Sequence, residues 1–167
     1  ESIKNSDYCA VRVYFIVHGR RKAASIAEAY LIAHQVDEHD FQFSRTTRRE
    51  DVEEITQNIR AEADLIVVIG GDGLFSLCVK ALLTRSGKIP VLAIIPSGSG
   101  NDFARNFGWK KSASDFIERL SRWEIKWIDT GVVKSALDTD YFVNETSSGI
   151  SNAVVQLVDQ KPPGWNG

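Results

Sequence analysis

Two glycine-rich segments have the residue types and the position to bind a phosphate group. They are Gly70-Gly71-Asp72-Gly73 and Pro96-Ser97-Gly98-Ser99-Gly100, and each directly follows a run of apolar residues. Glycines let a backbone turn approach a phosphate closely, and the N–H groups at the start of a following helix donate to its oxygens. A carboxylate such as Asp72 would repel that anion unless it serves Mg²⁺, a ribose hydroxyl or a hydroxyl proton awaiting removal.

A purely structural role is the alternative for both segments. The first fits a tight strand-to-helix turn in which Asp72 caps the helix, and the second fits a surface loop capped by Asn101. Two glycine turns at adjoining strand ends are harder to explain as simple connections, because connecting loops need no such pairing. The pair therefore favours a ligand site.

Alternating strands and helices position these turns. Apolar runs predict strands at 12–17, around Phe41 and Phe43, at 65–69 and at 91–95, and helical spacing predicts helices at 25–36, 52–59, 74–82 and 113–122. Strands that are apolar on both faces predict an α/β fold with a parallel sheet flanked by helices. Ligands bind at the carboxyl ends of such strands, where both glycine turns fall.

The last part of the chain has a different pattern. Strand-like segments at 125–130 and 141–144 follow one another around a turn at Gly131, with no clear helix between them. We therefore expect an α/β domain over residues 1–130 and the start of a truncated, β-rich second lobe over residues 131–167. The absence of methionine and the Pro- and Gly-containing end indicate a fragment of a longer protein.

Composition limits the classes of function. The chain has 167 residues and a formal charge of −2, so we expect no nucleic-acid partner, although the basic clusters at 20–22 and at 45, 48 and 49 could hold a phosphate. Cys9 and Cys78 match no metal or redox spacing, and no apolar run is long enough for a transmembrane segment. We expect a cytoplasmic protein in which Trp109, Trp123 and Trp127 are packing residues.

The two glycine segments carry a resemblance to a known family. VIGGDG (Val68 to Gly73) and IPSGSGNDFAR (Ile95 to Arg105) resemble the motifs of the diacylglycerol kinase catalytic domain, found in lipid kinases that act on diacylglycerol, sphingosine and ceramide. The resemblance extends from Arg12 to about Asn152. It includes Thr47, after the second strand, and the segment 141–144, which resembles the entry into the second lobe.

The resemblance implies a fold, a reaction and partners. The α/β lobe would be similar to NAD kinases and phosphofructokinases, and a cleft between it and a β-sandwich lobe would transfer the ATP γ-phosphate, with Mg²⁺, to a lipid hydroxyl. The implied partners are ATP or ADP and a lipid acceptor, which the protein would meet peripherally at a membrane surface. A homodimer is left open.

The resemblance also implies roles for individual residues. Asp72 would be the catalytic general base or a partner of Mg²⁺, with no separate protein metal site. The nucleotide would lie against three groups of residues, namely Gly70, Gly71 and Gly73; His18, Gly19, Arg20 and Thr47; and Ser97, Gly98, Ser99, Gly100, Asn101 and Asp102.

Several positions depart from the family pattern, among them Leu74, which replaces a common threonine where sphingosine and ceramide kinases also have an apolar residue. His18 stands where the family commonly has asparagine, and Leu77 replaces a usual glutamate. Leu77 keeps open a second hypothesis, a non-catalytic nucleotide-binding domain with the same fold. A third, a kinase of a soluble substrate resembling NAD kinase, is disfavoured because those enzymes lack the second motif.

Overall fold

The protein is an α/β domain built on a parallel sheet. The computed structural model describes residues 11–34, 39–84, 86–122, 125–136 and 139–144. The parallel strands are β1 (Arg12–His18), β2 (Asp40–Thr46), β3 (Leu65–Gly70) and β4 (Val91–Pro96), in the spatial order β2-β1-β3-β4. The helices are α1 (Lys22–Ala33), α2 (Asp51–Ile59), α3 (Asp72–Leu83), α4 (Asp102–Asn106) and α5 (Ala113–Arg122). The predicted fold class is confirmed.

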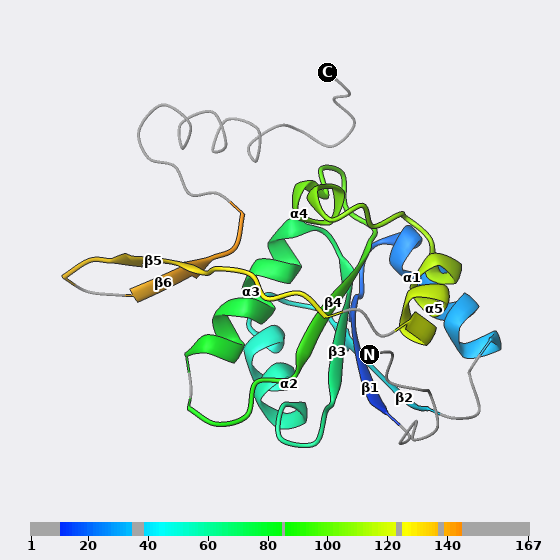
Figure 1. Ribbon diagram of the computed structural model, residues 1–167, viewed down its shortest axis with the longest axis horizontal. Coiled ribbons are helices and arrows are strands. Elements are labelled where there is room, and N and C mark those ends of the chain that lie inside the picture. Colours follow the sequence, from blue (N-terminus) through cyan, green and yellow to red (C-terminus); the bar gives the residue numbers. More distant parts are fainter. Residues whose placement is uncertain (1–10, 35–38, 85, 123–124, 137–138, 145–167) are drawn as a thin grey trace, which may run out of the picture.

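Helices cover both faces of the sheet (Figure 1), with α1 and α5 on one side and α2 and α3 on the other. Alternate residues of the central strands divide between the two layers, because successive side chains of a strand point to opposite faces. Ile16 and Val68 join the core under α2 and α3, whereas Phe15 and Val67 join the core under α1 and α5. All six residues of β3 are buried, as the apolar pattern predicts.

The tryptophan and cysteine side chains differ in how far they are buried. Trp109 packs in the core with the Arg119 guanidinium 4.9 Å from its ring centre, which confirms its packing role. Trp127 is 98% exposed, so the prediction for that residue is wrong, and Trp123 lies outside the described residues. Cys78 on α3 is fully buried, and this burial raises the pKa of its thiol to about 12.

The strand order creates a switch point between β1 and β3. From β1 the chain passes through α1 to β2 on one side, whereas from β3 it passes through α3 to β4 on the other side. Loops that leave neighbouring strands in opposite directions open a crevice at the carboxyl ends of those strands. The crevice here lies between the loop after His18 and the turn after Gly70.

An antiparallel hairpin of β5 (Gly131–Lys134) and β6 (Thr139–Phe142) projects from the α/β domain (Figure 1). The strand predicted at 125–130 is wrong, because these residues form no regular structure. Gly131 begins a strand and is not a turn. A Cβ there would lie 2.1 Å from the Phe142 ring, so glycine lets that ring cross the strand.

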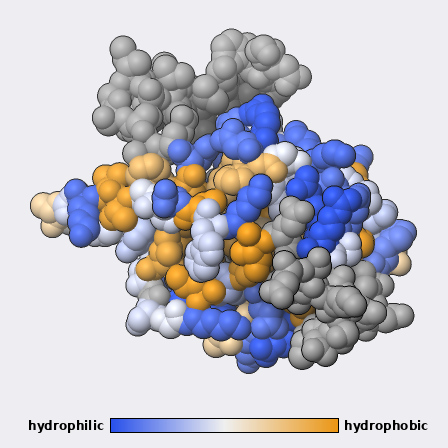
Figure 2. All heavy atoms as spheres, viewed as in Figure 1, coloured by the Kyte–Doolittle hydropathy of each residue, from blue (hydrophilic) through white to orange (hydrophobic). Residues whose placement is uncertain are grey.

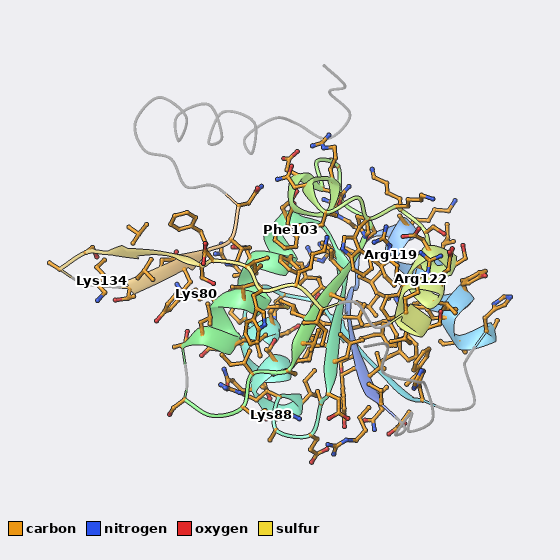
Figure 3. All side chains as sticks on the ribbon, in the orientation of Figure 1. Lys80, Lys88, Phe103, Arg119, Arg122 and Lys134 are labelled. Atoms are coloured by element: carbon orange, nitrogen blue, oxygen red, sulfur yellow. The ribbon has the colours of Figure 1, made fainter. Side chains whose placement is uncertain are left out.

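The hairpin carries exposed apolar side chains and is anchored to one helix. Figure 2 shows hydrophobic residues over the hairpin and beside it, among which Val132 and Val133 are exposed. Lys80 of α3, labelled in Figure 3, forms an ion pair of 3.1 Å with Asp140 of β6. Because of this bond, the pKa of Asp140 is lowered. Among the described helices, none combines the length and apolar character that crossing a bilayer requires.

Candidate functional site

A cavity of about 640 Å³ lies at the switch point of the sheet. It collects residues from the ends of β1 and β2 and from the first turns of α2 and α3. Its lining consists of His18, Arg20, Thr46, Thr47, Arg48, Arg49, Val52, Gly73, Leu74, Ser76 and Leu77. The fold thus brings together residues that the sequence separates by up to about sixty positions.

The cavity has a basic lining. Arg20, Arg48 and Arg49 contribute guanidinium groups beside His18, and among the described residues no carboxylate belongs to the lining. Clefts lined by charges of one sign concentrate ligands of the opposite sign, because their low-dielectric walls focus the field. The site is therefore suited to an anion such as a phosphate chain.

Gly19 joins the ends of the two strands that form the cavity floor. Its N–H donates to the Thr46 carbonyl over 3.0 Å, and an added Cβ would lie 2.2 Å from that oxygen. Only glycine fits so close to a backbone carbonyl. His18 Nδ1 accepts a bond of 3.4 Å from the Arg20 N–H, which places both residues at the cavity rim.

The loop after β2 is held by a carboxylate that lies behind the cavity. Asp51 accepts hydrogen bonds from the backbone N–H and the hydroxyl of Thr47, over 2.8 and 2.7 Å, and from the Arg48 N–H over 2.9 Å. These bonds, first among them that of the Thr47 hydroxyl, hold the pKa of Asp51 well below its usual range.

The first glycine turn is divided between the cavity and the interior. Gly73 lines the cavity, and an added Cβ there would meet nothing within 4 Å. Gly71 instead faces the second turn, where an added Cβ would be 3.0 Å from the Gly98 Cα. The prediction that all these glycines face the ligand remains open, but their surroundings differ.

The second glycine turn is packed against the first. A Cβ at Gly98 would lie 2.6 Å from the Gly71 Cα, so the two backbones touch. Asn101 is buried in the left-handed conformation, with φ 56°. Its amide oxygen accepts from the Gly98 N–H over 2.8 Å, and its amide nitrogen donates to the Gly98 carbonyl over 2.7 Å. Lys111 donates to the same carbonyl over 3.2 Å.

Asp72 connects the two turns. Its two oxygens accept from the backbone N–H groups of Asp102, over 3.1 Å, and Phe103, over 3.0 Å. Figure 3 labels Phe103 at the end of the sheet where α4 begins. Asp72 thus caps α4, and its own helix α3 has no side-chain cap. Beside it, the carboxylate oxygens of Asp72 and Asp102 lie 3.3 and 3.2 Å from the Cβ position of Gly100.

The predicted site residues therefore fall into two groups. His18, Arg20, Thr47 and Gly73 line the cavity, and Gly19 lies between its strands. The others form the adjoining turns outside the lining, namely Gly70, Gly71, Asp72, Ser97, Gly98, Ser99, Gly100, Asn101 and Asp102. No group of three or more metal-ligating side chains occurs in the part of the chain that the structure describes.

Sequence reasoning missed several contributors. Arg48 and Arg49 stood out only as a basic cluster, and Ser76 was not assigned to the site. Asp51 carried a partial signal, because acidic residues are typical of the first turn of a helix. Lys111 carried no such signal, since its reach to Gly98 depends on how the loop before α5 folds back.

An open parallel sheet with a basic cavity at its switch point defines an α/β domain whose cavity is suited to phosphate-bearing ligands. Comparison with known proteins gives the family: the chain belongs to the diacylglycerol kinase catalytic domain family, whose model matches residues 12–133.

Named relatives agree with this family. The chain is 28% identical over 135 residues to diacylglycerol kinase 4 of Arabidopsis thaliana, covering 69% of this chain and 27% of that protein. It is 36% identical over 93 residues to a diacylglycerol kinase of Bacillus subtilis, covering 53% and 28%. A crystal structure of a diacylglycerol kinase from Bacillus anthracis is 25% identical with a TM-score of 0.60, covering 71% of this chain and 42% of that one. The chain thus spans about a quarter of these curated relatives' length.

Proposed function

We propose that this chain is the nucleotide-binding part of an ATP-dependent lipid kinase, which transfers the γ-phosphate of ATP to a lipid hydroxyl such as that of diacylglycerol or a sphingoid lipid. The observation that carries the proposal is the basic cavity at the switch point, next to two glycine turns. Membership of a kinase family supports phosphoryl transfer as the chemistry. Catalysis of this kind depends mainly on positioning and on electrostatic stabilisation.

The residues present fit an ATP phosphate chain. Arg20 and Arg49 supply positive charge, and the open space at Gly73 leaves room for a phosphate against the first turn of α3. Ser97 is buried, and its hydroxyl has no hydrogen-bond partner among the described residues. A buried hydroxyl without a partner is costly, so a ligand or a water that reached it would be bound favourably.

The residues also fit Mg²⁺ that arrives with the nucleotide. Mg²⁺ is usually held by one or two protein carboxylates together with substrate phosphates. Asp72 and Asp102, which flank Gly100, are the carboxylates that would hold it. The cation would neutralise phosphate charge. In this proposal Asp72 orients that cation or accepts the proton of the lipid hydroxyl.

The proposal divides the chain as the sequence suggests. Residues 1–130 form the nucleotide-binding lobe, and residues 131–167 begin a β-rich lobe that supplies the other wall of the cleft. The protein would act in the cytoplasm, peripherally on a membrane that presents the lipid. In-line transfer needs nucleotide and acceptor held together, so residues 1–167 alone should bind ATP weakly and turn over little.

Calorimetric titration of residues 1–167 with ATP and Mg²⁺ tests the binding step. We expect binding at millimolar concentration that Arg49→Gln weakens. Arg122→Gln is the matched control, because Arg122 is an exposed arginine on α5 that pairs with Glu118, away from the cavity (Figure 3). No binding, or equal loss in both variants, contradicts the proposal. Phosphorylation of diacylglycerol and sphingosine by the protein that contains this domain tests the reaction.

A non-catalytic nucleotide-binding domain is the second candidate. It is favoured by Leu77, which brings an apolar side chain to the cavity, and by Asp72, whose two oxygens already accept backbone bonds. Nucleotide binding without lipid phosphorylation in the full-length protein would establish this candidate over the kinase.

A further inference from the structure

The loop between β2 and α2 is held by one partly buried carboxylate. Asp51 has only 18% of its side chain exposed. One of its oxygens accepts from both donors of Thr47 and from the Arg48 N–H, and the other accepts from the Arg48 Nε over 3.3 Å. Thr47 and Arg48 line the cavity, whereas Asp51 does not. Asp51 thus contacts the site only through its neighbours.

These bonds determine which way the Thr47 hydroxyl is polarised. An ionised carboxylate only accepts hydrogen bonds, so the short contact of 2.7 Å requires the hydroxyl to donate its proton to Asp51. The hydroxyl oxygen then has only lone pairs left for a ligand. The backbone N–H groups of Thr47 and Arg48 also donate to Asp51. This loop therefore offers a ligand an acceptor at Thr47.

The negative charge of Asp51 favours the same kind of ligand group as the Thr47 hydroxyl does. The Arg48 guanidinium is paired with Asp51 over 3.3 Å, and Arg20 and Arg49 also contribute positive charge to the lining. A phosphate near Thr47 would face a hydroxyl lone pair with the Asp51 charge behind it. A hydroxyl or amino group of a ligand would instead donate to Thr47. The Thr47 hydroxyl thus suits a donor group of the nucleotide better than a phosphate oxygen.

We propose that Asp51 is a positioning residue that fixes Thr47 as a hydrogen-bond acceptor, so that Thr47 recognises a donor on the nucleoside part of the ligand rather than a phosphate. The donor is a ribose hydroxyl or the adenine amino group. This inference rests on the proposed nucleotide binding and adds to it which side of the cavity selects the nucleoside.

The test of Thr47 uses ligands that lack one group at a time. MgATP, 2′-deoxy-ATP, 3′-deoxy-ATP, purine riboside triphosphate and inorganic tripolyphosphate are titrated into the chain and into Thr47→Val, with Thr47→Ser as the variant that keeps the hydroxyl. We expect Thr47→Val to weaken ATP binding about fivefold, the scale of one neutral hydrogen bond, and to leave tripolyphosphate unchanged. One analogue should bind the unmodified chain about fivefold less tightly than ATP but equal ATP in Thr47→Val.

That analogue identifies the donor, a ribose hydroxyl for the deoxynucleotides and the amino group for purine riboside triphosphate. Equal weakening of tripolyphosphate by Thr47→Val would overturn the inference, because Thr47 would then contact phosphate. It is also overturned if every analogue keeps its difference from ATP in that variant.

The test of Asp51 uses the same selectivity. Asp51→Ala frees the Thr47 hydroxyl to rotate, so the preference for ATP over the identified analogue should fall towards one. Asp51→Asn keeps an oxygen acceptor and should retain more of that preference. A purely structural role would weaken ATP and tripolyphosphate equally, which would overturn the assignment.

Asp64→Asn is the matched control, because Asp64 also accepts a backbone bond, from Arg12, but lies at the opposite end of the sheet. It should leave the selectivity unchanged. Failure of the unmodified chain to bind both ATP and tripolyphosphate would overturn the proposed function itself. Binding of ATP with selectivity that Asp51 and Thr47 do not influence would overturn this inference alone.

Discussion

The two glycine turns are alike in sequence and different in structure. The turn after β3 opens on the cavity at Gly73, whereas the turn after β4 packs its Gly98 against Gly71 and surrounds the Asn101 amide. The second turn thus braces the first. The comparison teaches that a glycine-rich motif can be required for the contact between two loops as well as for the approach of a ligand.

Asp72 is the bond between the turns, and Asp72→Asn should have the largest effect. In the full-length protein we expect the proposed lipid phosphorylation to fall about 100-fold or more, the scale for losing a positioned base. The structure adds a stability effect, because an asparagine has one acceptor for the two N–H groups of Asp102 and Phe103. A loss of about 1 kcal/mol in unfolding free energy should follow.

Lipid phosphorylation and urea unfolding of the same variant provide the measurements. Asp102→Asn serves as a stability control, since it removes a neighbouring carboxylate that pairs with Arg105. If Asp72→Asn keeps its turnover but is less stable, Asp72 only holds the two turns together. That result would remove Asp72 from the catalytic mechanism and would favour the non-catalytic candidate.

Alanine at one glycine of each turn contrasts their roles. At Gly98 the new Cβ would lie 2.6 Å from the Gly71 Cα and 2.9 Å from the Asn101 amide oxygen, so we expect Gly98→Ala to lose about 2 kcal/mol of stability. At Gly73 the Cβ meets open space in the cavity, so Gly73→Ala should keep its stability and weaken ATP binding. Thermal midpoints and calorimetry measure the two effects. Equal loss of stability in both variants would contradict the division of roles.

Asn101 tests whether the second turn is held by its side chain or by its backbone conformation. Asn101→Ala loses two buried hydrogen bonds and keeps the strain of a positive φ, so we expect a loss of about 1.5 kcal/mol. Asn101→Gly removes the strain and loses the same bonds. A glycine variant as stable as the parent in urea unfolding would show that the conformation matters and the amide does not.

Lys111 should give the smallest effect. Its bond to the Gly98 carbonyl is made by an exposed side chain, and we expect Lys111→Met to change stability by less than about 0.5 kcal/mol. If Lys111 only braces the second turn, ATP binding in calorimetry should also stay unchanged. Weaker binding without a stability change would mean that this lysine reaches the ligand.

Much of the fold could be predicted from local patterns. The burial of β1 and β3 on both faces follows from their continuous apolar residues, and α5 occupies the predicted residues 113–122. The segment 125–130 was mispredicted because it contains apolar and β-branched residues but pairs with no described strand. Pairing is a property of the tertiary structure, and a local pattern does not contain it.

The location of the site could be predicted from the sequence. Which residues line the cavity and which hold the two turns together could not. The order of elements places both glycine turns and Thr47 at one edge of the sheet. The sequence does not show that Asp72 bonds to α4, or that Gly98 touches Gly71, because these contacts join residues about thirty positions apart. Asp51 is a mixed case, because its place among acidic residues indicates a helix start but does not show that its carboxylate bonds to Thr47 at the cavity.

The buried Cys78 thiol can report local opening of the layer formed by α2 and α3. With a pKa of about 12, its thiol is almost entirely protonated at neutral pH, and the fully buried sulfur is out of reach of an alkylating reagent. Modification must therefore wait until the layer of α2 and α3 separates from the sheet. In a Cys9→Ser background, the labelling rate would measure the free energy of that local opening, and a nucleotide that binds against α3 would slow it.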